Sequence, residues 1–199
     1  MAGRACGLEA VTAVSYLGGA AAVGGGCGRP GVAGIFVRDP GGWQLVGPTS
    51  PELRGGRIEV VSLRAAGGTL VSLLSVTRAT GTELVAAWTS DGEHWTCSRP
   101  LSLAASEHLG SVGPATGTGL FALLDDAAGG QRLAVVTPDA GWQALPSPPA
   151  DSVTVAFTGA RVDALSVRQA TLTVWALAAR NDWTRAQTVH VPIQYGSSS

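Results

Sequence analysis

The sequence predicts an all-β protein built from about four repeated four-stranded units. Four tryptophans, Trp43, Trp95, Trp142 and Trp183, recur at separations of 52, 47 and 41 residues. Each follows a strand-like apolar run and a tight turn, which together indicate a hairpin. No apolar stripe with the 3.6-residue period of a helix persists for three turns, so no major helix is expected.

The tryptophan-led segments form the last turn and strand of each repeat. They are RDPGGWQLVGP at 38–48, TSDGEHWTCSRP at 89–100, TPDAGWQALPSP at 137–148 and ARNDWTRAQ at 179–187. The runs before these turns are VAGIFVRD, TELVAAWTSD, QRLAVVTPD and TLTVWALAA. Each unit therefore contains a strand, a turn and a tryptophan-led strand.

In each unit, another hairpin precedes the one that contains the tryptophan. In the first unit LEAVTAVSYL and AAAVGGG are joined by Gly18-Gly19, and in the second RIEVVSLRA and TLVSLLSV are joined by Gly67-Gly68. HLGSVGPA and GLFALLDD form the third, and SVTVAFTGA and VDALSVRQ the fourth. We expect one domain over 1–199, with units at about 6–48, 57–101, 107–149 and 151–193 and a flexible tail at 194–199.

Four strands in about 47 residues match a β-propeller blade. A single four-stranded meander cannot bury both faces, whereas stacked blades can. The runs VVSL, LVSLLSV and LAVV are apolar on both faces, as strands between two neighbours should be. The prediction is a β-propeller with about four visible blades. The chain could be the C-terminal part of a larger propeller, or its last strand, TVHVPI, could pair with the first unit and close the ring.

The segment TSDGEHWT at 89–96 resembles the Asp-box of BNR/sialidase-like propellers. Thr89, Asp91, Gly92 and Trp95 occupy the motif positions, with one residue fewer than the usual spacing. Weaker copies are RDPGGW and TPDAGW, which contain Asp39 and Asp139. The resemblance implies structural roles: each Asp accepts backbone N–H bonds in its turn, and each Trp packs between blades.

The resemblance does not extend to catalysis. Sialidases of this fold use a tyrosine nucleophile and three arginines, but Tyr16 falls within a strand run and Tyr195 lies near the end of the chain. No arginine stands in a matching motif, so no catalytic residue is expected. The pair Glu107-His108 opens the third unit beside the presumed central channel, and these two residues are the candidates for ligand binding.

The three cysteines are Cys6, Cys27 and Cys97, and none lies in a CxxC motif. No histidine stands at a metal-ligand spacing, so neither a metal nor another cofactor is expected. Cys6 and Cys27 flank one hairpin and could form a disulfide in a secreted protein. The Gly18-Gly19 turn would place Cys27 opposite Ala10, so the segment before the hairpin must fold back to form the bond.

Charge and hydropathy limit the possible partners. The net charge is −1, only 14% of residues are charged, and no basic stretch is present, which argues against nucleic-acid binding. No 18-residue window lacks polar residues, so no transmembrane segment is expected. Residues 8–26 could be read as a signal peptide ending at Cys27, but the repeat favours two strands there.

These observations lead to one expected function and two alternatives. The first is a non-enzymatic binding or scaffold module outside the cytoplasm or at the cell surface, whose partner is a glycan or a protein. The second is a sialidase-like glycan hydrolase, which would need two suitably separated carboxylates. The third is an incomplete C-terminal fragment of a longer propeller protein.

Overall fold

The computed structural model describes residues 6–159, 161–178 and 182–191. Within these residues it contains β-strands and one three-residue 3-10 turn, η1 (Pro51–Leu53). The prediction of an all-β protein is therefore confirmed. The expected tail at 194–199 lies outside the described residues.

The strands form four antiparallel sheets in chain order. Sheet I contains β1 (Leu8–Leu17), β2 (Ala20–Cys27), β3 (Gly34–Asp39) and β4 (Gly42–Leu45). Sheet II contains β5 (Arg57–Ala66), β6 (Thr69–Arg78), β7 (Gly81–Thr89), β8 (Thr96–Cys97) and β9 (Leu101–Ser102). Sheet III contains β10 (Glu107–Pro114), β11 (Leu120–Asp126), β12 (Gln131–Thr137) and β13 (Gly141–Leu145). Sheet IV contains β14 (Ser152–Thr158), β15 (Arg161–Arg168), β16 (Thr171–Leu177) and β17 (Trp183–His190).

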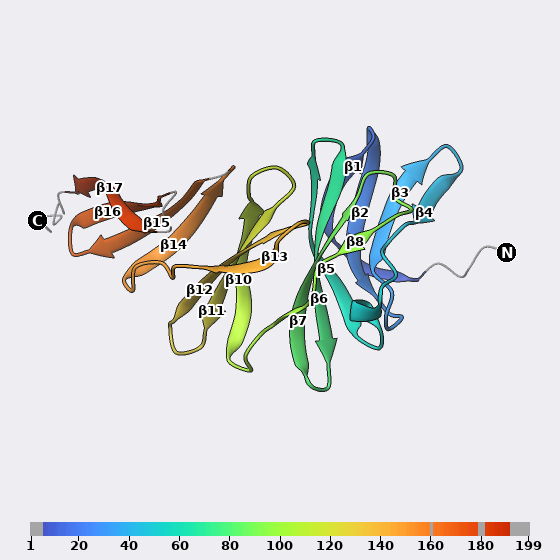
Figure 1. Ribbon diagram of the computed structural model, residues 1–199, viewed down its shortest axis with the longest axis horizontal. Helices are drawn as coiled ribbons and strands as arrows, with labels where there is room; N and C mark the ends of the chain where they lie inside the picture. The colour runs from blue at the N-terminus through green and yellow to red at the C-terminus, as the bar shows by residue number, and fades with distance from the viewer. Residues whose placement is uncertain (1–5, 160, 179–181, 192–199) are drawn as a thin grey trace, which may run out of the picture.

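The sheets follow one another in a row, with sheet I and sheet IV at opposite ends (Figure 1). Over the described residues they do not close into a ring, and β17 pairs with β16 and not with sheet I. Each is a meander in which neighbouring strands are consecutive in the chain, apart from β9, which pairs with β7 beside β8. The structure thus has the predicted repeat of four-stranded units, while the closed propeller stays a prediction.

Glycine pairs make two of the predicted hairpins. Gly18 and Gly19 have φ angles of 55° and 85°, and Gly67 and Gly68 have 56° and 81°. Positive φ at both central residues defines the turn whose twist matches two antiparallel strands, and glycine adopts it without steric cost.

Every first strand carries an irregularity in its pairing with the second. The shifts lie at Leu8/Ala10 and Val11/Ala13 in β1, Val60/Ser62 in β5, Leu109/Ser111 in β10 and Ser152/Thr154 in β14. Such bulges bend a strand and increase its twist. The two shifts in β1 also correct the expected register, because Cys27 lies opposite Leu8 and not Ala10.

Three apolar cores lie between successive sheets. The first core joins sheets I and II and includes Ala22, Ile35, Ile58, Val60, Leu74 and Val85. The second joins sheets II and III and includes Leu73, Leu84, Leu120, Leu124 and Val136. The third joins sheets III and IV and includes Phe121, Leu133, Val162 and Ala164. Sheets II and III are covered on both faces, which explains their continuous apolar runs.

Candidate functional site

The turn between β7 and β8 is organised by Asp91 and Thr89. The Asp91 Oδ1 atom accepts the backbone N–H bonds of Glu93 and His94, each at 2.8 Å. The Thr89 hydroxyl accepts the N–H of Gly92 at 2.9 Å and donates to Asp91 Oδ1 at 3.0 Å. Gly92 has a φ of 80°, a conformation that glycine tolerates best.

His94 completes this turn. Its Nδ1 lies 2.7 Å from Asp91 Oδ2. The backbone N–H of His94, followed by its imidazole, holds the pKa of the Asp91 carboxyl well below its usual range. The same carboxylate raises the pKa of His94. Both side chains are exposed, and their bonds go to the turn itself.

The tryptophan-led turns that contain Asp39 and Asp139 are held differently. Asp39 Oδ1 accepts one N–H bond, from Gly41 at 2.7 Å. In the turn between β12 and β13 the Thr137 hydroxyl, and not Asp139, accepts the N–H bond of Ala140 at 3.2 Å. The three aspartates therefore occupy similar places in the chain but make different bonds.

In each of sheets II, III and IV, one tryptophan connects the sheet to the preceding one. Trp95, directly before β8, packs into the first core and donates from Nε1 to the carbonyl of Val46 at 2.6 Å. Trp183 packs into the third core and donates to the carbonyl of Pro146 at 3.1 Å. Trp142 packs into the second core, where its buried Nε1 has no hydrogen-bond partner among the described residues.

Trp43 is the exception among the four. It lies in β4, with 48% of its surface exposed. Its cross-strand partner is Arg38, two residues beyond Phe36, so Trp43 and Phe36 lie on the same face of sheet I. That face points away from sheet II, because Ile35, the neighbour of Phe36, belongs to the first core.

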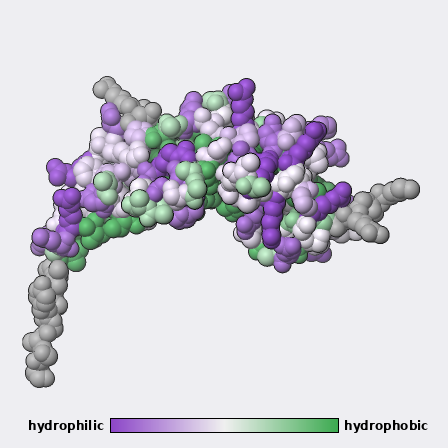
Figure 2. Space-filling view, turned by 90° about the horizontal axis from the view of Figure 1, so that it is seen from below, coloured by the Kyte–Doolittle hydropathy of each residue, from purple (hydrophilic) through white to green (hydrophobic). Residues whose placement is uncertain are grey.

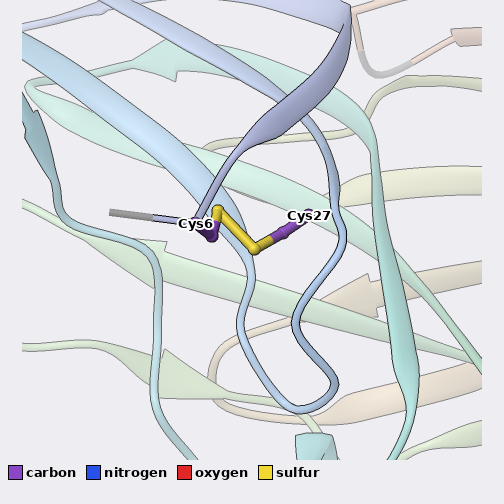
Figure 3. Close-up of a disulfide and its surroundings, with 2 residues drawn as sticks. All are labelled: Cys6 and Cys27. Atoms are coloured by element: carbon purple, nitrogen blue, oxygen red, sulfur yellow. A yellow bond between two sulfur atoms is a disulfide. The ribbon is translucent and has the colours of Figure 1, made fainter. Parts of the chain in front are cut away.

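Cys6 and Cys27 form a disulfide, with their Cα atoms 5.6 Å apart (Figure 3). The bond fastens the segment before β1 to the end of β2. Together with Phe36 the two cysteines form a small buried cluster on the outer side of sheet I. Cys97 is free and half-buried, and burial raises the pKa of its thiol.

Glu107 and His108 lie at the start of β10. Two bonds of 2.9 Å join the Glu107 carboxylate to Nε and Nη2 of Arg132 in β12. The N–H of Ala104 donates to the same carboxylate at 2.8 Å. Arg132 is the main reason why the pKa of Glu107 is lowered. Glu107 is thus held as a carboxylate, while His108 is exposed to solvent.

A groove of about 350 Å³ brings these two residues together with side chains from other sheets. We call it the inner groove; its lining is Thr12, Glu59, Val61, Ser75, Thr82, Leu84, Leu103, Glu107, His108 and Leu109. Glu59 pairs across the strands with Ser75, and Ser75 pairs with Leu84, so the three lie in one row. Leu84 belongs to the second core, and the row therefore faces sheet III.

Sequence reasoning missed Glu59 and Thr12. Both sit within strand runs whose apolar neighbours dominate the pattern, and only the stacking of sheets brings them to Glu107. The one available signal was the charge of Glu59 inside the apolar run IEVVSL. The mixture of two carboxylates, three hydroxyls and an imidazole over a leucine floor suits a ligand with many hydroxyl groups.

Neither a metal site nor a membrane helix is found within the described ranges. No group of three or more His, Cys, Asp or Glu side chains there could hold a metal ion. Among the same residues no helix has the length and apolarity needed to cross a membrane.

Comparison with known proteins yields no family. No family model and no curated protein matches the chain. Among solved structures, the computationally designed Ika4 protein aligns with a TM-score of 0.40 at 16% identity, covering 96% of this chain and 100% of that one. A protein from Lactobacillus plantarum aligns with a TM-score of 0.39 at 12% identity, covering 95% of this chain and 73% of that one.

Proposed function

We propose that the chain is a propeller-type binding module of the BNR/Asp-box kind, which binds a glycan in the inner groove without transforming it. The observation that carries the proposal is the groove itself, in which Glu59 and His108 stand among hydroxyl groups beside an apolar floor. Protein–glycan contacts need such paired polar and apolar surfaces, because a sugar ring has hydroxyls at its rim and C–H groups on its faces. The bonds of Asp91 support the Asp-box resemblance.

The proposed location is outside the cytoplasm. The Cys6–Cys27 disulfide supports it, because such bonds persist in oxidising compartments.

Glu107 has a positioning role in this proposal. Its carboxylate is engaged by Arg132 and by the N–H of Ala104, which leaves Glu59 and His108 as the ionisable side chains of the groove that can meet a ligand. A carboxylate held by an arginine is also a weak general acid, because it keeps its charge. The arrangement therefore favours binding over the hydrolase alternative.

The test uses a panel of immobilised neutral and sialylated oligosaccharides. We expect the purified chain to bind a subset of them, and Glu59→Gln and His108→Ala each to weaken binding at least fivefold with unchanged melting temperature. Glu93→Gln is the matched control, because Glu93 is an exposed carboxylate outside the groove. The absence of binding to every oligosaccharide would overturn the proposal, as would equal effects of Glu59→Gln and Glu93→Gln.

The same panel, labelled with a fluorogenic leaving group, tests the hydrolase alternative. Two carboxylates, Glu59 and Glu107, line one groove, which is the observation in its favour. Turnover that disappears in both Glu59→Gln and Glu107→Gln would establish hydrolysis in place of simple binding.

A further inference from the structure

The outer side of sheet I carries a continuous apolar surface. Its largest exposed side chains are Val11, Val14, Tyr16 and Trp43, at 55%, 65%, 60% and 48% exposure. A shallow hollow on the same side is lined by Cys6, Leu8, Val11, Val23, Phe36 and Trp43. We call this surface the leading face. Exposed apolar surfaces of this kind mark interaction sites in soluble proteins.

The leading face corresponds to surfaces that are buried in the other three sheets. The tryptophan of each later sheet marks the side turned to the preceding sheet: Trp95 lies in the first core, Trp142 in the second and Trp183 in the third. In sheet I the same side carries Trp43, which no sheet among the described residues covers. Sheet I therefore has the surface of an inter-sheet interface without its partner.

Sheet IV presents the opposite half of such an interface. Val162 and Ala164 of β15 face sheet III in the third core. Val167 lies five and three residues further along the same strand, and because side chains alternate between the two faces, it points away from sheet III. Val167 pairs with Leu172, and Leu172 pairs with Val189, which makes an apolar row across three strands. Val167 and Val189 are 42% and 40% exposed. We call this surface the trailing face.

Figure 2 shows hydrophobic residues along the hollowed lower margin at the end of the molecule that carries sheet IV. The two unpartnered faces are at opposite ends of the row in Figure 1. Geometry of this kind suits an assembly that continues from one copy to the next.

We propose that the leading face of one copy docks on the trailing face of a second copy of this chain. Each of the three internal interfaces already joins a leading side to a trailing side, so the contact between copies continues an arrangement that the fold uses three times. Such a contact is heterologous, meaning that two different surfaces meet. Two copies joined at both ends would place their eight sheets in one closed ring.

Sedimentation velocity over a range of concentrations tests the proposal. We expect a concentration-dependent species of twice the 20.0 kDa of one chain. Val14→Arg and Val167→Arg should each raise the protein concentration needed to form this species at least tenfold, because each would bury an unpaired charge in the contact. Gln44→Arg is the control, because Gln44 is exposed in β4 but pairs with Val37, which packs against the first core.

Mixing the two arginine variants distinguishes the two possible contacts. In a heterologous dimer, the mixture retains one interface between the unmodified leading face of the Val167→Arg copy and the unmodified trailing face of the Val14→Arg copy. Dimer should therefore reappear in the mixture but in neither variant alone. A contact of two leading faces would make Val167→Arg harmless, and that result would overturn the proposal.

A monomeric wild-type chain at every concentration would overturn it as well, and would point to a further sheet of another chain or of a longer chain as the occupant. Near-ultraviolet circular dichroism checks that each variant is folded. If Val14→Arg fails to fold, Tyr16→Arg tests the same face, because Tyr16 is 60% exposed. The experiment needs no glycan, so its outcome is independent of the proposed binding function.

Discussion

The indole N–H of Trp95 donates to the carbonyl of Val46 across the boundary between sheets I and II, with 2.6 Å between the atoms. Val46 directly follows β4, the last strand of sheet I. The carbonyl of Pro146 has the same place after β13 and accepts the bond of Trp183. These two bonds fix the outer strand of one sheet to the end of the preceding sheet, in addition to the apolar contacts in the cores.

Trp95→Phe should lower the free energy of unfolding by about 1–3 kcal/mol, because the Val46 carbonyl loses its partner and part of the first core is left unfilled. Trp43→Phe is the matched control. With Trp43 half exposed and outside the three inter-sheet cores, its replacement in the monomer should change that energy by less than about 0.5 kcal/mol. Urea unfolding followed by circular dichroism measures both. Equal losses in the two variants would contradict the distinction between these tryptophans.

The three turn aspartates should differ in their effect on stability. Asp91→Ala should lower the melting temperature most, because two backbone N–H groups and His94 lose their acceptor. Asp39→Ala removes one such bond and should have a smaller effect. Asp139→Ala should be nearly neutral, because Thr137 holds that turn. A thermal melt of each variant gives the order, and a larger loss for Asp139→Ala than for Asp39→Ala would contradict it.

The local features could be predicted from sequence because each depends on few neighbouring residues. Gly18-Gly19 and Gly67-Gly68 define their hairpins through backbone conformation alone. In the turn between β12 and β13, by contrast, Thr137 and not Asp139 accepts the backbone N–H bond. The similarity of TPDAGW to RDPGGW concealed this difference.

Features that depend on register or on the stacking of sheets could not be predicted. Two single-residue bulges in β1 move the partner of Cys27 from Ala10 to Leu8, and no residue type in that strand requires a bulge. The inner groove is a second example, because Thr12, Glu59 and Glu107 come from three sheets and are far apart in the chain. Glu107 and His108, which also line this groove, became candidates from the sequence only because they begin a unit.

Removal of the disulfide should destabilise sheet I. Cys6 and Cys27 are 21 residues apart, and opening a loop of that length costs about 3 kcal/mol in the chain-entropy account. The double variant Cys6→Ala/Cys27→Ala should therefore unfold at clearly lower urea concentration. Cys97→Ala is the control, because Cys97 forms no disulfide. Thiol titration of the unreduced, unfolded wild type should find one free thiol, and three would contradict the bond.

The ion pair between His94 and Asp91 should produce a measurable shift in titration and in stability. The carboxylate raises the pKa of His94 above the usual histidine value of 6.5, so the pair's contribution on the histidine side is complete below pH 6.5 and is lost as the pH rises through the raised pKa. The pKa of Asp91 is lowered from the usual aspartate value of 3.8, so its contribution is complete above pH 3.8 and is lost as the pH falls through the lowered pKa. The pair should therefore stabilise the turn most strongly between these limits.

Titration of the imidazole protons by NMR should give a pKa above 6.5 in the wild type and a lower pKa in Asp91→Asn. Asp139→Asn, which leaves the β7–β8 turn intact, should retain the wild-type value. An unchanged His94 titration in Asp91→Asn would show that another group, and not the Asp91 carboxylate, controls the histidine.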